Sequence, residues 1–182
     1  MAMPATTKRW TLEEVHSLPD DGNKYELIHG ELYVTPPPSP EHDTTIARLN
    51  ALLIPYVIRH ELGLVYHPRS VIRWRGSEVE PDLMVRRVPM GVFEKDEDWE
   101  RMPTPLLVVE VSSRSTRRRD VGPKRDFYME VGVPEYWFVD RPYRSLRVVR
   151  PGVDDIAVGD SYRWQPADVS EPLVVDVQPL FG

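Results

Sequence analysis

The sequence predicts one domain of the α/β (α+β) class, in which a mixed β-sheet is flanked by helices and carries extra antiparallel strands. Leu106–Val111 is apolar except for Glu110 and contains no turn residue, which is typical of a strand buried on both faces. A helical stretch follows, and then the apolar run Tyr136–Val139. Strand, helix and strand in this order predict a right-handed crossover between roughly parallel strands. The 182 residues are the length of one sizeable domain, 1–182.

The N-terminal part predicts a short helix and a hairpin. Thr11 and Glu14 have the spacing of a capping box, so a helix is expected to begin there. The runs Tyr25–Ile28 and Glu31–Val34 flank His29-Gly30, a dipeptide suited to a tight turn between two strands.

A longer helix and an edge strand are expected next. Ser39 as cap and Pro40 in the first turn open the helix, and Pro55 is expected to kink or shorten it. Leu64–Trp74 is interpreted as one strand, interrupted by Pro68 and therefore at an edge.

The remaining elements surround the crossover. Val79–Val85 is expected to be a strand and Val88–Pro105 a long polar loop. The crossover helix is placed at about Asp120–Val131, with Pro123 in its first turn and Gly132 after its end. Short antiparallel strands are expected in the tail at Ser145–Val149, Ser161–Trp164 and Leu173–Val175.

The composition is that of an ordinary globular protein, 41% hydrophobic and 29% charged. Its net charge of −6 argues against a protein that coats nucleic acid by bulk positive charge. The absence of cysteine excludes disulfides, thiolate zinc sites and cysteine nucleophiles. No run approaches the roughly 18 consecutive apolar residues of a membrane span. Met1–Trp10 lacks the apolar core of a secretory signal, so we expect a cytoplasmic protein without membrane contact.

Two acidic residues interrupt strands of the predicted core. A carboxylate at Glu110 loses its water and needs a cation, a proton or a metal. Asp82 interrupts the preceding strand in the same way. If the strands pair, both carboxylates converge on a divalent cation, and Mg²⁺ needs only one or two carboxylates. The alternatives are a Pro-Asp turn at Asp82 and a buried ion pair with an arginine at Glu110.

The crossover helix adds a candidate cation. Asp120, Lys124 and Tyr128 are spaced by four and share a helix face. Lys124 is the only lysine after Glu110, and a lysine near a metal can orient or deprotonate a bound water or stabilise charge on phosphate. The alternative is a surface pair between Lys124 and Asp120.

Four arginines, Arg114, Arg117, Arg118 and Arg119, directly follow the strand that carries Glu110. We expect them to neutralise a nucleic-acid backbone near the site, which would reconcile such a substrate with an acidic chain. A solvated loop is the alternative, and it is our interpretation of the acidic stretch Glu94–Glu100.

Five motifs occur in order: Tyr25-Glu26-Leu27-Ile28-His29-Gly30-Glu31; Pro81-Asp82-Leu83; Val109-Glu110-Val111-Ser112-Ser113; Asp120…Lys124…Tyr128; and Gly132-Val133-Pro134-Glu135-Tyr136-Trp137 with Val139-Asp140. In this combination the chain, from about Trp10 to Asp140 and in outline throughout, resembles the restriction-endonuclease-like family of the PD-(D/E)XK nuclease superfamily. The resemblance implies a nuclease core with Mg²⁺ or Mn²⁺ at Asp82 and Glu110, and DNA as the substrate.

The chain departs from the superfamily pattern at one position. The lysine expected two residues after the second acid is replaced by Ser112, so the resemblance points to Lys124 on the following helix as its substitute. It also points to Glu26 as a third carboxylate and to His42 as a contact of phosphate or metal-bound water. The alternatives are a half-exposed hairpin residue for Glu26 and a polar surface residue for His42.

The resulting hypothesis is a metal-dependent endonuclease in which Asp82, Glu110 and the carbonyl of Val111 hold the cation. The alternatives are a non-catalytic nucleic-acid- or protein-binding module on a nuclease fold and a carboxylate-pair hydrolase acting on sugars. A homodimer is plausible because one such site cuts one strand. The aromatic residues Trp99, Tyr143 and Trp164 are candidates for its interface, with core packing as the alternative.

Overall fold

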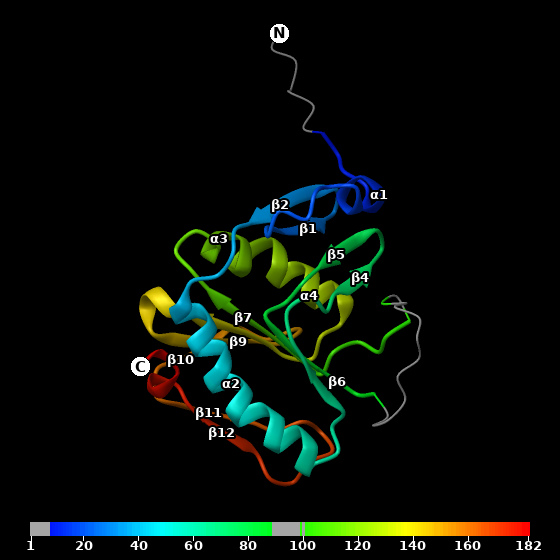
Figure 1. Cartoon of the computed structure of the whole chain (residues 1–182). Coiled ribbons are helices and arrows are strands. Elements are labelled where there is room, and N and C mark those ends of the chain that lie inside the picture. The colour runs from blue at the N-terminus through cyan, green and yellow to red at the C-terminus, as the bar shows by residue number, and fades with distance from the viewer. Residues whose placement is uncertain (1–7, 89–98, 100) are drawn as a thin grey trace.

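The structure, a computed structural model, describes residues 8–88, 99 and 101–182. A six-stranded sheet lies at the centre, with the long helix α2 across one face and a second helical layer beneath a smaller sheet on the other (Figure 1). This mixed α+β architecture confirms the predicted fold class. Among the described residues, no helix has the length and apolar character needed to cross a membrane.

The central sheet has the strand order β10-β9-β8-β7-β6-β3. Only β7 and β8 pair in parallel, and the other neighbours are antiparallel. In chain order the strands are β3 (Leu64–Tyr66), β6 (Leu83–Arg86), β7 (Leu107–Ser112), β8 (Tyr136–Asp140), β9 (Ser145–Val149) and β10 (Ile156–Val158). The expected parallel pair and its crossover are thus confirmed, and β6 pairs directly with β7.

The crossover is one helical segment in three parts: α3 (Arg117–Arg119), a π-helical stretch η1 (Asp120–Lys124) and α4 (Arg125–Val131). It begins three residues before the predicted Asp120, so Pro123 lies inside the π-helical stretch and not in a first turn. In a regular α-helix the proline ring would collide with the carbonyl of residue i−4, and the wider π-helical turn gives the ring room. The segment ends as expected at Gly132, whose φ is 83°.

The smaller sheet has the order β2-β1-β5-β4 and comprises β1 (Lys24–Ile28), β2 (Glu31–Thr35), β4 (Ile72–Trp74) and β5 (Ser77–Val79). The predicted hairpin is confirmed, and its turn residues His29 and Gly30 both have positive φ, 49° and 81°. α1 (Leu12–His16) begins at Thr11 with the predicted capping box.

Two predicted strands were wrong because each is divided between the two sheets. Leu64–Trp74 forms β3 in the large sheet and β4 in the small one, separated at Pro68 and at Arg69, which has a φ of 78°. Val79–Val85 is divided at Pro81-Asp82, so that β5 ends at Val79 and β6 begins at Leu83. The predicted loop Val88–Pro105 falls mostly on residues 89–98 and 100, outside the described residues.

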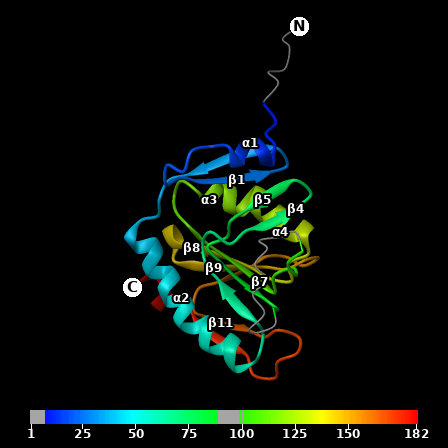
Figure 2. The same ribbon diagram turned by 45° about the vertical axis from the view of Figure 1, so that its right-hand side comes forward.

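Helix α2 (Pro40–Arg59) begins at Ser39 and Pro40 as predicted, but Pro55 does not end it. Pro55 has no N–H, so the carbonyl of Ala51, one helical turn earlier, has no helical hydrogen-bond donor. Both residues are exposed, so water can donate to that carbonyl instead. Beside α2 lie β11 (Ser161–Trp164), β12 (Leu173–Asp176) and the short helix η3 (Gln178–Phe181), as Figure 2 shows. Another short helix, η2 (Arg141–Tyr143), follows β8.

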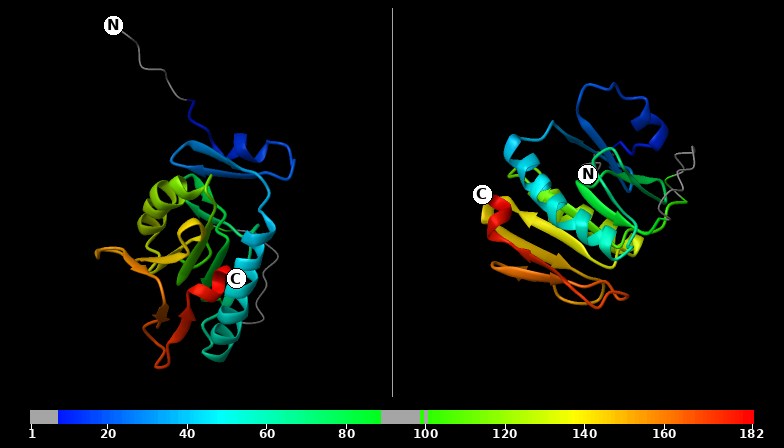
Figure 3. Two further views of the ribbon diagram at one scale, coloured as in Figure 1. Left: turned by 90° about the vertical axis from the view of Figure 1, so that its left-hand side faces the viewer. Right: turned by 60° about the horizontal axis from the view of Figure 1, so that its bottom comes forward.

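The two faces of the central sheet pack into separate cores. On one face, Leu107, Val109 and Val111 contact the core formed with α2 and the β11–β12 hairpin. On the other, Val108 packs with α4 and with the smaller sheet. Figure 3 shows this layering from two further directions. Alternation along β7 therefore directs Glu110 into the core beneath α4 and the smaller sheet.

For Trp164 the alternative of core packing is confirmed, because this residue is 2% exposed and belongs to the core beside α2. Trp99 is partly buried beside Tyr66, and Tyr143 is 70% exposed. Of the three aromatic residues, only Tyr143 lies fully at the surface.

Two glycines allow a paired test of the backbone. Gly63 joins α2 to β3 with a φ of 106°, and a Cβ added there would lie 2.0 Å from the Arg86 carbonyl oxygen. Gly132 also has positive φ, but an added Cβ would meet nothing within 4 Å. We expect Gly63→Ala to lower the free energy of unfolding by about 3 kcal/mol and Gly132→Ala by about 1 kcal/mol. Equal losses in urea titrations would contradict the close approach at Gly63.

Candidate functional site

Asp82 and Glu110 lie together because β6 and β7 are neighbours. Leu83 pairs with Val109, so Asp82, one residue before β6, lies beside Glu110 and Val111. The Val111 amide donates to Asp82 Oδ2 at 2.7 Å. This bond ties the Asp82 carboxylate to the backbone of the strand that carries Glu110.

Two basic side chains also reach Asp82. His42, in the first turn of α2, has Nε2 hydrogen-bonded at 3.2 Å to Asp82 Oδ2. Lys24, the first residue of β1, has Nζ 3.7 Å from Asp82 Oδ1 and donates at 3.0 Å to the Glu80 carbonyl oxygen. Helix α2 and the smaller sheet therefore meet at Asp82. His42 is 14% exposed, so it is not the polar surface residue considered as an alternative.

Lys124 points inward and is fully buried. Its Nζ donates to Glu110 Oε1 at 2.7 Å and lies 2.8 Å from Glu26 Oε1. The alternative of a surface pair with Asp120 was wrong, because Asp120 is 2% exposed and is approached by Arg119 instead. A cation on the crossover helix thus occupies the place beside Glu110 that Ser112 cannot fill.

Glu26 is also fully buried, so it is not a half-exposed hairpin residue. Besides Lys124, its Oε1 accepts from the Glu80 amide at 3.0 Å, and its Oε2 lies 3.4 Å from Arg119 Nη1. Glu110 Oε1 accepts a further hydrogen bond from the Tyr128 hydroxyl. The Tyr-Glu-Leu-Ile motif thus brings a carboxylate from β1 to the same lysine that bonds Glu110.

The electrostatics of the carboxylates differ. Burial raises the pKa of Asp82, but the His42 hydrogen bond and the charge of Lys24 outweigh it and hold that pKa well below its usual range. Burial also raises the pKa of Glu26, and there the charges of Lys124, Lys24 and Arg119 bring it below its ordinary value. For Glu110, burial dominates over the attraction of Lys124 and raises the pKa to about 7.

The basic groups respond in the opposite sense. Burial lowers the pKa of Lys24, but attraction to Glu26 and Asp82 outweighs it and raises that pKa above its ordinary value. Burial also lowers the pKa of His42, but the hydrogen bond and charge of Asp82, together with those of Asp43, outweigh it and raise that pKa above its ordinary value. Both groups therefore favour their charged forms beside Asp82.

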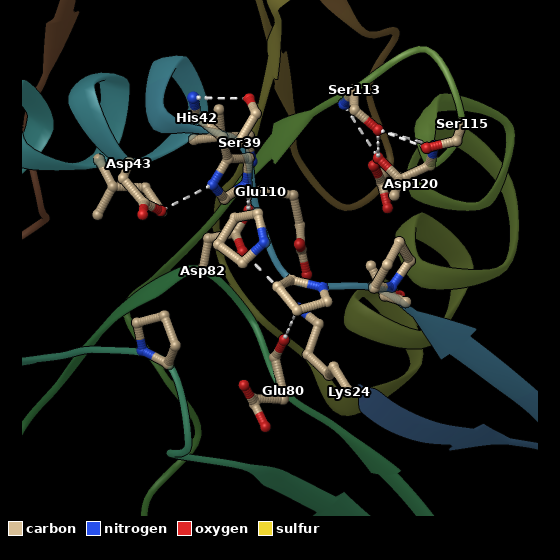
Figure 4. A pocket seen from close by; sticks show the side chains of 18 of the residues that line it. Lys24, Ser39, His42, Asp43, Glu80, Asp82, Glu110, Ser113, Ser115 and Asp120 are labelled. Carbon is tan, nitrogen blue, oxygen red and sulfur yellow. Dashed lines mark hydrogen bonds and ion pairs between the residues drawn. The ribbon is translucent and has the colours of Figure 1, made fainter. Parts of the chain in front are cut away.

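These side chains surround a pocket of about 370 Å³. Asp82, Glu110 and Val111 line this pocket. In Figure 4, His42 lies above Asp82, and Lys24 lies below it beside Glu80. The loop after β7 and the tripeptide Pro36–Pro38 complete the walls. Lys124 and Glu26 are not among the described residues that line this pocket. Lys124 bonds Glu110 from the buried side, and Glu26 in turn contacts Lys124.

The pocket residues fit a small, hard cation. Of the carboxylates that line the pocket, Asp82 and Glu110 each have one oxygen bonded by the protein. The other, Asp82 Oδ1 or Glu110 Oε2, receives no hydrogen bond from the described residues. Within the same part of the chain, no three His, Asp or Glu side chains form a metal-binding cluster. Mg²⁺ does not require one, because it binds through one or two carboxylates and keeps several waters.

The four arginines after β7 do not form one basic surface, which corrects the sequence interpretation. Arg119 turns inward to Glu26 and Asp120 and is 11% exposed. Arg117 donates to Asp140 Oδ2 at 2.9 Å and lies over the Tyr143 ring. Arg114 and Arg118 are exposed. Successive residues of a helix point about 100° apart, so neighbouring arginines in a helical run project into different surroundings.

Lys24 was not predicted as a site residue from the sequence. A strand places residues i and i+2 on one face, so Lys24 and Glu26 at the start of β1 would be expected to point the same way. That alternation was the available signal, and the structure brings both side chains toward the Asp82–Glu110 wall.

Comparison with known proteins assigns the family. Residues 12–182 match the model of the Uma2 family, described as "Putative restriction endonuclease". The chain belongs to the Uma2 family. The match covers every residue of the site, from Lys24 to Tyr128, so the resemblance seen in the motifs is confirmed at the family level.

A solved structure shares the fold. The crystal structure of "a putative nuclease belonging to DUF820" from Anabaena variabilis ATCC 29413 superposes with a TM-score of 0.77 at 20% sequence identity. The alignment covers 94% of this chain and 97% of that chain. No match was found among curated proteins.

Proposed function

We propose that this Uma2-family protein is a metal-dependent endonuclease that hydrolyses phosphodiester bonds of DNA. The observation that carries the proposal is the pairing of β6 with β7, which places Asp82, Glu110 and the Val111 backbone on one wall of a pocket. These groups supply two carboxylates and a carbonyl, the oxygen ligands that Mg²⁺ and Mn²⁺ take.

The protein groups have distinct parts in this proposal. Asp82, Glu110 and the carbonyl oxygen of Val111 would hold the cation. His42 and the Val111 amide orient Asp82, and Lys124, Tyr128 and Glu26 hold Glu110 in place. When bound, the cation supplies positive charge that polarises the scissile phosphate and makes a water more acidic. That Lys124 also orients this water stays a prediction.

The electrostatics of the site leave a part for a cation. Four buried carboxylates, Glu26, Asp82, Glu110 and Asp120, face the basic side chains Lys24, Lys124 and Arg119, and His42 beside Asp82 favours its charged form. These bases balance the carboxylates but leave no excess positive charge for a phosphate. A bound dication would supply that charge and would counter the repulsion between the carboxylates and an approaching phosphate.

The proposal is tested by metal binding and cleavage together. Calorimetry with Mn²⁺ should show binding, and supercoiled plasmid and single-stranded DNA should be cleaved in Mg²⁺ but not in excess chelator. Absence of Mn²⁺ binding at millimolar concentrations, with DNA still bound, would support the non-catalytic module instead. Cleavage of both duplex strands requires two such sites, and a homodimer stays a prediction that sedimentation can check.

The exposed arginines are proposed to contact the DNA backbone. We expect Arg114→Gln with Arg118→Gln to weaken DNA binding similarly for all sequences and to reduce the slope of log affinity against log salt by roughly 2. The matched control is Arg59→Gln, an exposed arginine at the other end of α2 from His42. An unchanged salt slope in the double variant, measured by fluorescence anisotropy in Ca²⁺, would remove these residues from the interface.

A further inference from the structure

The pocket has its own lysine, distinct from the one on the crossover helix. Besides His42, whose ring is bonded to Asp82, the described cationic side chains on its walls are Lys24, Arg69 and Arg119, whereas Lys124 is fully buried behind Glu110. Arg69 is 72% exposed at the rim. Lys24 is therefore the lysine that a substrate group inside the pocket can touch, since 18% of its side chain remains exposed.

The ammonium of Lys24 is fixed by one hydrogen bond and still has unused donors. It donates at 3.0 Å to the Glu80 carbonyl oxygen, and its 3.7 Å separation from Asp82 Oδ1 is too long for a hydrogen bond. A lysine has three donors, so donors remain for which the described residues offer no acceptor. Lys124 differs, because two carboxylate oxygens lie within 2.8 Å of its Nζ.

Arg119 is less suited to this contact than Lys24. Its guanidinium is engaged by Thr35 Oγ1, by Glu26 at 3.4 Å and by Asp120 at 3.5 Å. A phosphate would have to compete with two carboxylates for it. At Lys24 the competing carboxylate is Asp82, and a cation bound there would weaken that competition by neutralising its charge.

We propose that Lys24 touches the substrate: its ammonium binds a non-bridging oxygen of the phosphate being hydrolysed, an assignment that rests on the function proposed above. An ammonium is a compact point charge that suits a phosphate oxygen at short range. The backbone carbonyl of Glu80 fixes its position relative to Asp82. Lys124, by contrast, is a positioning residue for Glu110.

The opposing view is that Lys24 is only a counter-ion for Asp82. The two roles predict opposite effects on metal affinity. Without the nearby positive charge, Asp82 should bind a dication equally well or more tightly, if its position is kept by His42 and Val111. If Lys24 instead holds Asp82 in place, its removal should weaken metal binding and DNA binding in parallel.

The experiment compares wild type, Lys24→Gln, Lys24→Arg and the matched control Lys8→Gln, which removes a lysine that is 57% exposed and pairs with Glu14. Three quantities are measured: Mn²⁺ affinity by calorimetry, binding of a fluorescein-labelled single-stranded oligonucleotide in Ca²⁺ by anisotropy, and cleavage in Mg²⁺. We expect Lys24→Gln to weaken oligonucleotide binding about tenfold and to lower kcat by about 10- to 100-fold. Its Mn²⁺ affinity should be kept or increased. Lys24→Arg should restore binding more than kcat, and Lys8→Gln should match wild type.

Each departure has a defined meaning. Binding and cleavage by Lys24→Gln within about twofold of wild type would overturn the assignment and leave the nuclease proposal intact. Parallel loss of Mn²⁺ affinity would also overturn it, in favour of the counter-ion role. A wild-type protein that binds no Mn²⁺ and cuts no DNA would reject the nuclease proposal. Lys24 would then be judged by oligonucleotide binding alone: a tenfold loss in Lys24→Gln would keep the phosphate contact, and unchanged or absent binding would reject it.

Discussion

Glu110→Gln and Asp82→Asn are each expected to reduce Mg²⁺-dependent DNA cleavage by at least about 100-fold. Each change replaces a carboxylate by an amide of nearly the same shape, so packing in the buried strands is kept while one negative charge is lost. The bonded oxygens Asp82 Oδ2 and Glu110 Oε1 would remain acceptors. The amide nitrogen would then replace Asp82 Oδ1 or Glu110 Oε2, the oxygens that we propose bind the cation. Plasmid cleavage and Mn²⁺ calorimetry on the same preparations measure the loss.

A buried carboxylate elsewhere provides the matched control. Glu135 is 6% exposed and bonds Trp137, Arg150 and Tyr162, away from the pocket. Glu135→Gln is expected to lower stability while Mn²⁺ affinity and kcat stay near wild type. Cleavage by Glu110→Gln at the wild-type rate would remove that carboxylate from the chemistry, and an equal loss in Glu135→Gln would show that burial alone explains the effect.

Lys124→Met is expected to destabilise the fold by about 3 to 5 kcal/mol, because it leaves two buried carboxylates facing each other without their shared cation. The loss corresponds to a fall in Tm of about 10 °C for a chain of this length. Thermal denaturation without added metal measures it. Adding Glu26→Gln to Lys124→Met should recover part of the loss, because one of the two uncompensated charges is then gone.

The pH dependence of that loss has a definite sign. In wild type, burial raises the pKa of Glu26 and Glu110 while Lys124 opposes it in both. Without Lys124 the pKa of Glu110 rises further above that of the unfolded chain, and the pKa of Glu26 rises because it loses the strongest of the attractions that hold it down. The folded variant therefore loses stability as these groups ionise. The deficit relative to wild type should therefore be large near about pH 8 and smaller near about pH 5. A deficit independent of pH would mean that lost packing, not lost charge, causes the destabilisation.

The central part of the fold was predictable because long apolar runs leave little choice. The composition of Leu106–Val111 is that of a strand buried on both faces, and the acid inside this run marked the site. The two carboxylates were expected to meet if their strands paired, and β6 and β7 do pair. Local capping signals were equally dependable, since Thr11 and Ser39 act on residues within one helical turn.

What failed depended on contacts between distant segments. Short strands such as β3, β4 and β5 carry too few residues to reveal which sheet they join, so two of the predicted strands were each a fusion of two. The pairing of Lys124 with Glu26 joins β1 to the crossover helix, and no periodicity reports such a pair. The run of arginines did not show which side chains point to solvent. Arg119 points inward because it pairs with the buried carboxylates Glu26 and Asp120.

Glu80 lies in the segment that joins β5 of the smaller sheet to β6 of the central sheet, and β1 holds it there, because the Glu80 amide bonds Glu26 and its carbonyl oxygen accepts from Lys24. The first hairpin is therefore a part of the charged centre and not an appendage that could be trimmed. A shortened protein beginning at α2 would lack both Lys24 and Glu26, and the ammonium of Lys124 would then be open to water on the side that Glu26 covers. A shortened protein that retains the whole charged centre must therefore keep the chain from β1 onward.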